Sequence, residues 1–178
     1  MTKPRAFIFI LVLSVVSACS NWAETPDVAG FSGAEASIVS LSIGKILRSD
    51  EELMFVCGQS DGLAIYADEI QKGYQTDRIK DGRMAFVKGG DRYDLIVRPT
   101  GGNYVRLSEE GAVIQRLMPS NAPDAESWSI YYPDTGMTET HNLAETPEGL
   151  IDLHTESKPA SLGLPPRAFL FRAKCRRA

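Results

Sequence analysis

The chain contains only two histidines, and both lie close to carboxylates in short segments of alternating polarity. His141 stands in MTETHNL with Glu139, and His154 stands in LIDLHTES with Asp152. If the two segments pair across the turn between them, His141 faces Asp152. In the same register Glu139 faces His154, and all four side chains share one face because strand side chains alternate. Two imidazoles and two carboxylates could hold Zn²⁺, or a carboxylate could orient a histidine as a general base.

That register places Leu143 opposite Leu150 at the closed end of the hairpin. A ladder of opposite charges also forms on the solvated face of an ordinary hairpin, and no H-x-x-x-H spacing supports a metal. We therefore expect cross-strand pairing at these positions, with no metal, no cofactor and no catalytic residue. The alternative is a metalloenzyme or hydrolase that uses this hairpin, for which the candidate residues are Glu139, His141, Asp152 and His154.

Residues 58–62, GQSDG, match the G-x-S-x-G pattern of a hydrolase nucleophile. The mechanism needs the serine on a sharp turn between a strand and a helix above a parallel sheet. The following residues, LAIYADE, alternate like a strand instead, and no strand–helix–strand units follow. We expect a hairpin turn here, with Ser60, Asp61 and Gly62 supplying the turn residues.

The three cysteines divide into one at the N-terminus and two in the body of the chain. Residues 6–16 form a short apolar run after Lys3 and Arg5, and small residues follow, which is the plan of a secretory signal peptide. The run is too short to span a bilayer, which takes about 20 apolar residues. In an exported chain, Cys57 and Cys175 are then expected to form one disulfide.

The stretch VSAC, residues 16–19, resembles the lipobox of bacterial lipoproteins. The resemblance implies cleavage before Cys19 and attachment of acyl chains to it, and two or more chains hold a soluble domain stably on a membrane. It predicts three parts: a signal peptide (1–18), a lipid-anchored tether with an ambiguous segment (19–48) and a β-barrel domain (49–178). The expected location is the cell envelope, on a membrane facing the periplasm; the alternative is a soluble periplasmic or secreted protein.

Charge and length restrict the function further. Removal of Lys3 and Arg5 takes two of the 19 basic residues, leaving 17 against 23 acidic ones and a net charge of −6. A nucleic-acid partner, which needs a basic face, is therefore not expected. About 160 mature residues suffice for one domain with a real core.

From residue 53 onward, short apolar or alternating runs recur every 8 to 12 residues, separated by turn dipeptides and without helices between them. This pattern predicts an all-β fold: an antiparallel up-and-down meander of about 8–11 short strands closing into a β-barrel, with a β-sandwich as the alternative. Asp81-Gly82 predicts a hairpin between the strands on either side. Residues 37–53 are ambiguous. Leu41 and Ile43 alternate with Ser40, Ser42 and Gly44 like a strand, whereas Ile38, Leu41, Ile46 and Leu47 could share one side of a short helix.

The cysteine pair supports closure of the barrel. Cys57 ends the first clear strand and Cys175 the last, 118 positions later. A disulfide requires Cα atoms within about 7 Å, so these two strands must be neighbours. In a meander the first and last strands meet when the sheet closes on itself, which also removes exposed edges.

Taken together, these features predict a non-enzymatic, membrane-tethered envelope lipoprotein that binds a protein partner through its loops. In outline the chain is similar to small periplasmic lysozyme inhibitors, which combine a lipobox, a barrel and a disulfide; GGNYVR (101–106) loosely resembles their binding motif. The longest connections, 119–127 and 157–166, are the expected contact regions, with Asn121, Asp124, Leu162 and Leu164 as candidates. The alternative is a lipocalin-like carrier with a small apolar ligand inside the barrel.

Overall fold

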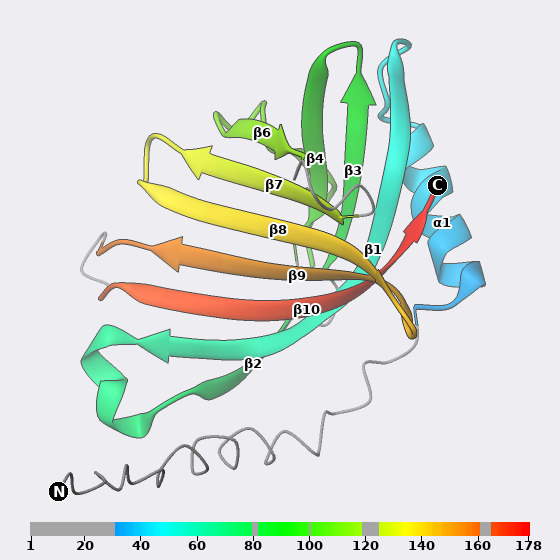
Figure 1. The fold of residues 1–178 in the computed structure, drawn as a ribbon. Helices are drawn as coiled ribbons and strands as arrows, with labels where there is room; N and C mark the ends of the chain where they lie inside the picture. Colours follow the sequence, from blue (N-terminus) through cyan, green and yellow to red (C-terminus); the bar gives the residue numbers. More distant parts are fainter. Residues whose placement is uncertain (1–30, 80–81, 100, 119–124, 161–164) are drawn as a thin grey trace, which may run out of the picture.

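The described residues of the computed structural model, 31–79, 82–99, 101–118, 125–160 and 165–178, form one strongly curled antiparallel sheet with a single α-helix against its outer side (Figure 1). The signal peptide, Cys19 and the four loop candidates lie outside these residues. The elements are α1 (Gly33–Gly44), β1 (Glu51–Tyr66), η1 (Ala67–Lys72), β2 (Gln75–Ile79), β3 (Arg83–Gly89), β4 (Arg92–Arg98), β5 (Val105–Arg106), β6 (Val113–Leu117), β7 (Ala125–Tyr132), β8 (Met137–Thr146), β9 (Gly149–Lys158) and β10 (Arg167–Arg177).

The strand order is β5-β4-β3-β1-β10-β9-β8-β7-β6, with β2 paired to β1 beside this path. The predicted all-β, barrel-like meander is confirmed, in the form of a half-barrel. The first and last strands, β1 and β10, do pair, and the sheet is interrupted between the consecutive strands β5 and β6. We call this interruption the seam.

The predicted disulfide is present at the centre of the sheet. Cys57 and Cys175 are directly opposite each other in the β1–β10 ladder and are bonded, with Cα atoms 4.0 Å apart. Both cysteines are buried in the apolar core on the inner side of the curl.

Two predictions about turns are wrong, and one long strand explains both. Residues 58–62 form no turn, because β1 runs through them with only a bulge between Cys57 and Ser60. The strands on either side of Asp81-Gly82 do not form the predicted hairpin either, since β2 pairs with residues 60–64 of β1 whereas β3 pairs with residues 51–57, and Asp81 itself lies outside the described residues. The strands β2 and β3 therefore lie end to end along the same side of β1.

The glycines of this segment are needed for close approach rather than for a turn. A Cβ atom on Gly62 would lie 2.1 Å from the backbone oxygen of Leu170 on β10. A Cβ atom on Gly58 would lie 2.7 Å from the ring of Phe31. The sequence GQSDG thus lets β1 pack tightly against the neighbouring strand and the segment before α1.

The helix is fixed at its start by a capping box and along its length by apolar packing. The Ser32 hydroxyl accepts a hydrogen bond from the backbone N–H of Glu35, and the Glu35 carboxylate accepts one from the N–H of Ser32. The helix buries Ala36, Val39 and Ile43, and Ile43 is fully inaccessible. The predicted face was therefore wrong, because Ile38 and Leu41 point to solvent.

The helix packs against the outer side of β1, β3 and β4. Its buried residues join a second apolar cluster with Val56, Ala85, Val87 and Ile96. The folded domain consequently includes residues 31–48, part of the segment expected to act as a tether. None of the described helices is long and apolar enough to cross a bilayer.

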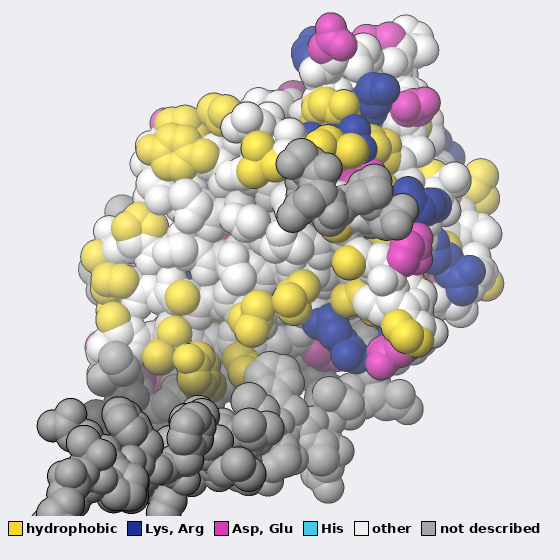
Figure 2. Space-filling view, in the orientation of Figure 1, with side chains coloured by type: hydrophobic (Ala, Val, Ile, Leu, Met, Phe, Trp, Pro, Cys, Tyr) yellow, Lys and Arg dark blue, Asp and Glu magenta, His cyan; other side chains and the backbone are white. Residues whose placement is uncertain are grey.

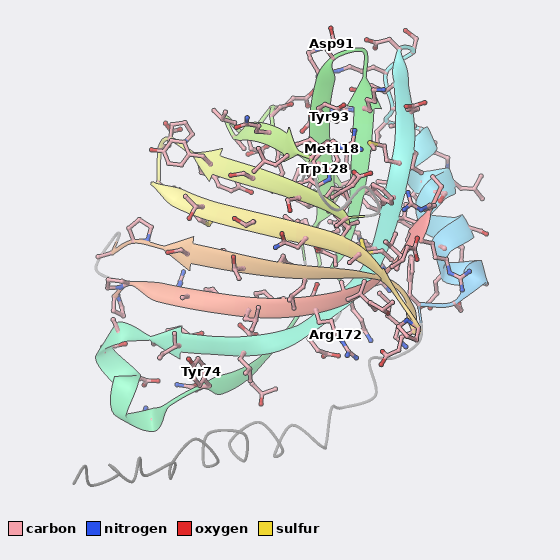
Figure 3. The ribbon with its side chains drawn as sticks, viewed as in Figure 1. Tyr74, Asp91, Tyr93, Met118, Trp128 and Arg172 are labelled. Carbon is pink, nitrogen blue, oxygen red and sulfur yellow. A yellow bond between two sulfur atoms is a disulfide. The ribbon has the colours of Figure 1, made fainter. Side chains whose placement is uncertain are left out.

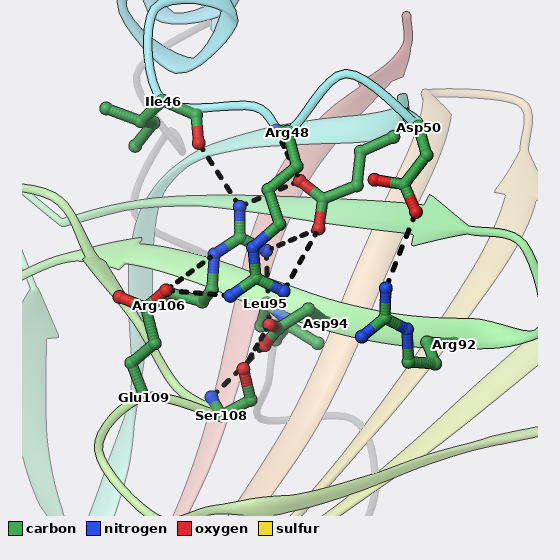
Figure 4. A network of polar contacts seen from close by, with 10 residues as sticks. Ile46, Arg48, Asp50, Arg92, Asp94, Leu95, Arg106, Ser108 and Glu109 are labelled. Carbon is green, nitrogen blue, oxygen red and sulfur yellow. Dashed lines mark hydrogen bonds and ion pairs between the residues drawn. The ribbon is translucent and has the colours of Figure 1, made fainter.

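A buried ion network ties the segment before β1 to the β5 side of the seam (Figure 4). The Arg106 guanidinium donates to both carboxylate oxygens of Glu51, at 2.9 and 2.8 Å, and to Asp94 at 3.1 Å. A third acceptor is the backbone oxygen of Ile46, at 3.2 Å. Because Arg106 pairs with both buried carboxylates, removing Arg106 would leave Glu51 and Asp94 without this cation in a buried site.

Candidate functional site

The two histidines lie on the inner face of the curled sheet, packed against each other on neighbouring strands. His141 of β8 is directly opposite His154 of β9, and the imidazole rings stack with centroids 4.6 Å apart. Phe86 approaches His141 edge-on, and Phe171 lies 5.1 Å from His154. Both histidines are almost fully buried, and no histidine is visible on the face shown in Figure 2.

The predicted register of this hairpin is wrong by two residues, although its face is right. Asp152 pairs with Leu143, and Leu150 pairs with Glu145, because the turn contains only two residues between Thr146 and Gly149. A shift of two preserves the face of every side chain, since strand alternation has a period of two. The four candidate residues therefore still converge, with the histidines opposite each other.

Asp152 joins the two imidazoles through a single oxygen. The Nδ1 atoms of His141 and His154 lie 2.8 and 3.0 Å from its Oδ2 atom. Glu139 approaches from the other side, its Oε2 atom 3.5 Å from Nε2 of His141. We call these four residues the buried histidine cluster: Glu139, His141, Asp152 and His154.

Charge pairing shifts the pKa values in this cluster. Burial lowers the pKa of His141, but the carboxylates of Asp152 and Glu139 outweigh it and raise that pKa to about 9. Burial raises the pKa of Asp152, yet His141 and His154 bring it down to about 2. Burial likewise opposes ionisation of Glu139, and the two histidines hold its pKa below the ordinary value. Burial, with Glu139 alongside, raises the pKa of Tyr132.

The cluster also contains buried polar atoms whose hydrogen-bonding capacity is unused. Within the described part of the chain, Oδ1 of Asp152 and Nε2 of His141 are inaccessible and have no hydrogen-bond partner. Three side chains, His141, Asp152 and His154, each offer one ligand atom, and these atoms lie within 4.8 Å of one another. Such a set could hold a metal ion.

The outer face of the same strands is different in kind, because it carries no charge. Three rows of side chains cross β6 to β9, as their pairing shows. The rows are Leu117–Ser127–Asn142–Leu153, Gln115–Ser129–Thr140–Thr155 and Val113–Tyr131–Thr138–Ser157. We call these twelve residues the outer Ser/Thr face.

Four large apolar side chains project from this face: Val113 is 57% exposed, Leu153 46%, Tyr131 45% and Leu117 42%. In Figure 2 the region over β7 to β10 is mostly white and yellow, whereas Lys, Arg, Asp and Glu gather over β1, β3, β4 and the side of α1. The first charge beyond the three rows is Arg172 of β10, opposite Leu153, which is labelled in Figure 3.

At the seam, β6 is a free edge. Among the described residues it pairs only with β7. Arg116, its single charged residue, turns inward to Glu126 and to the hydroxyl of Tyr93. Tyr93 in turn packs against Trp128 where β4 approaches β7 (Figure 3). A cavity of about 520 Å³ lies here, lined by residues of β4, β6 and the connection between β5 and β6.

The remaining sequence candidate, Ser60, is not placed for nucleophilic catalysis. It is buried within β1, between β2 and β10, and the strand continues beyond it to Tyr66, so no strand-to-helix turn stands at this position. The free edge and the outer Ser/Thr face were missed at the sequence level, although alternation in SWSIYY and MTETHNL already placed Ser and Thr on one side. Comparison of the chain with protein-family models, curated proteins and solved structures finds no match.

Proposed function

We propose that the protein is a membrane-tethered envelope lipoprotein whose β-domain binds a protein partner, without catalysis, through the outer Ser/Thr face. The observation that carries this proposal is the absence of charge from twelve adjacent outward side chains that end in the free edge of β6. In the whole chain 24% of residues are charged. The outer Ser/Thr face therefore differs from the chain as a whole in its content of charged residues.

The physical argument concerns desolvation. Charged residues are depleted from the centres of protein interfaces, because a buried ion needs a well-placed partner, whereas Tyr is enriched there. Ser, Thr, Asn and Gln exchange hydrogen bonds with water for hydrogen bonds with a partner at small net cost. The exposed Tyr131, Leu153, Val113 and Leu117 supply the apolar contacts.

The outer Ser/Thr face is too small for a stable interface by itself, which indicates that the backbone edge of β6 also contacts the partner. With strands about 4.8 Å apart and about 3.4 Å per residue, the three rows cover about 400 Å². A stable interface buries about 800 Å² per partner. The rest is available at the seam, where no described strand pairs with the outer edge of β6 and its backbone N–H and C=O groups can receive an added strand. Natural edge strands are usually guarded by charges or proline, and the only charge of β6 points inward.

The interior favours this proposal over a carrier of apolar ligands. The space inside the curl is filled by large side chains, among them Phe55, Phe86, Trp128 and Ile130. Catalysis by Ser60 would need a turn and a helix in place of a continuous strand.

The lipid anchor rests on the VSAC sequence and is tested separately. We expect mass spectrometry of the membrane fraction to find acyl chains on Cys19. We expect Cys19→Ala to release the protein from membranes. A Cys19→Ala protein that stays on the membrane would contradict lipidation without touching the binding proposal.

Partner binding is tested by placing a photo-crosslinking amino acid at Thr140 and Leu117 in the full chain, expressed in cells. The control position is Tyr74, which is 71% exposed and lies apart from the face, beyond β2 (Figure 3). We expect one discrete protein adduct from Thr140 and Leu117 and none from Tyr74, and mass spectrometry then identifies the partner.

Lysine substitutions provide the matched functional test. Leu153→Lys and Val113→Lys place a charge on the face and its edge, and should each weaken binding of the purified partner at least tenfold. Tyr74→Lys adds the same charge elsewhere and should leave the affinity unchanged. Equal adducts from all three crosslinker positions, or unaltered binding by both lysine variants, would reject the proposal. A cross-link to another molecule of the same protein would show that the partner is a second copy of this chain.

A further inference from the structure

We propose that the buried histidine cluster is a binding site for one divalent transition-metal ion, with Zn²⁺ the best match. The ligands are Nδ1 of His141, Nδ1 of His154 and the carboxylate of Asp152. This site is on the inner face of the sheet, opposite the outer Ser/Thr face, and it is independent of the proposed function.

The convergence of the three side chains is the first argument. The two Nδ1 atoms point at the same carboxylate, at 2.8 and 3.0 Å from Oδ2. In a tetrahedral zinc site, with bonds of about 2.0–2.2 Å, neighbouring ligand atoms are about 3.4 Å apart. Each imidazole nitrogen therefore needs to move only about half an ångström from the carboxylate oxygen, and the three ligand atoms already lie within 4.8 Å of one another.

The unused oxygen is the second and independent argument. Oδ1 of Asp152 is fully buried and has no hydrogen-bond partner among the described residues. A buried carboxylate oxygen without a partner is costly in a folded protein. Coordination of a metal by this carboxylate would satisfy it.

Glu139 provides the outer support that metal-binding histidines usually have. When Nδ1 of His141 binds a metal, its proton resides on Nε2, which lies 3.5 Å from Oε2 of Glu139. A carboxylate that faces the second ring nitrogen fixes the tautomer and orients the ring.

Charge balance also favours a divalent ion. Glu139 and Asp152 bring two negative charges to a place where His141, His154 and Asp152 are almost inaccessible. A divalent cation neutralises both carboxylates while the imidazoles remain uncharged. The ligand set, two imidazoles and one carboxylate, is one that Zn²⁺ accepts with a fourth position left for water or another group.

The first test is direct metal binding by the untagged mature protein, freed of metal by a chelator and then titrated with ZnCl₂. We expect one Zn²⁺ per chain by elemental analysis. We also expect Co²⁺ to give the visible absorption of a site with nitrogen and oxygen ligands. His154→Gln should abolish stoichiometric binding. Glu139→Gln should weaken it by about 10–100-fold, because the outer carboxylate is lost. Glu145→Gln, which removes an exposed carboxylate of the same strand, should have no effect.

A second measurement needs no variant and so does not depend on mutants that fold. Since the chain has only two histidines, nitrogen NMR of ¹⁵N-histidine protein resolves both rings. With zinc, both rings should carry their proton on Nε2; without zinc, Nδ1 should be protonated. The absence of stoichiometric zinc together with unchanged tautomers would overturn the proposal and leave a proton-bridged cluster. So would full zinc binding by a His141→Gln/His154→Gln protein.

Discussion

Removal of the disulfide should destabilise the domain by several kcal/mol, and the structure sets the magnitude. The bond joins residues separated by 118 positions. For a loop of that length the chain-entropy relation gives about 4.9 kcal/mol at 25 °C. Since whole domains are stable by about 5–15 kcal/mol, this loss would remove between about a third and all of the stability of the domain in Cys57→Ala/Cys175→Ala.

The mechanism predicts more than a loss of stability. Cys57 and Cys175 face each other in the β1–β10 ladder, which is paired on both sides of the bulge that follows Cys57, so the native sheet should persist without the bond. The effect should then arise in the unfolded chain, which expands when the cross-link is removed. The dependence of unfolding free energy on urea should therefore steepen as the midpoint falls.

The assay is urea unfolding at 25 °C in a Trp22→Phe background, so that fluorescence reports Trp128 alone, which is fully buried in the native state. Wild type, wild type with a reducing agent, and the double-alanine variant should be compared. We expect the last two to lose about 3–5 kcal/mol relative to the first. A loss below about 1 kcal/mol, with free thiols verified in the reduced sample, would refute the loop-closure argument.

Three further changes test other parts of the fold. Gly62→Ala should cost about 2 kcal/mol or more in urea unfolding, because its Cβ would lie 2.1 Å from the Leu170 oxygen; an unchanged midpoint would contradict this. Ile43→Ala should cost about 2–5 kcal/mol, since Ile43 is fully buried, while Ile38→Ala on the exposed side should cost about 0.5 kcal/mol or less; equal losses would disprove the packing. In the presence of a chelator, stability should be full below pH 6.5 and fall by up to about 3 kcal/mol as pH rises to about 9. This follows because the carboxylates, acting against burial, raise the pKa of His141 from 6.5 to about 9. The pH dependence should flatten in His141→Gln.

The fold class could be predicted from sequence because turn residues are a local signal. The disulfide could be predicted because two cysteines remain once Cys19 is set aside. Turn dipeptides at regular spacing exclude long helices, and in a chain expected to be exported, the two cysteines of its body can form only one disulfide with each other. The position of the seam could not be predicted in this way. A meander whose ends pair can be interrupted at any hairpin, and the connection between β5 and β6, which includes Leu107 and Ala112, contributes to the core instead of extending the ladder.

The two mispredicted turns show where local signals fail. Asp81-Gly82 has the composition of a tight hairpin, and GQSDG has that of a turn. Strand pairing along β1 overrides both of these local turn preferences. The 16 residues of β1 pair on one side with two successive strands and on the other with β10. Pairing of this kind depends on the length of the strand and on the close backbone approach at Gly62. A sequence pattern of a few residues carries no information about either.

For the histidine hairpin, the sequence determined the face but neither the register nor the burial. The turn is two residues long, and a register error of two leaves every side chain on its own face. Burial depends on which way the sheet curls. Alternating Glu, His and Asp residues on one side suggested a solvated face, yet that side carries His141 and Asp152 into the core, and the uncharged Ser and Thr residues face outward.

The curl is held in two different ways on its two sides, and this places the free edge. On the closed side β1 and β10 share a long backbone ladder with a disulfide inside it. Across the seam, described contacts are made by side chains: Arg116 to the Tyr93 hydroxyl, and Tyr93 to Trp128. Side-chain contacts of this kind contribute about 1 kcal/mol each, whereas a ladder adds one bond for nearly every residue. Among the described residues no strand pairs with the outer edge of β6, so we expect an added strand to meet the outer Ser/Thr face there without first displacing a paired neighbour.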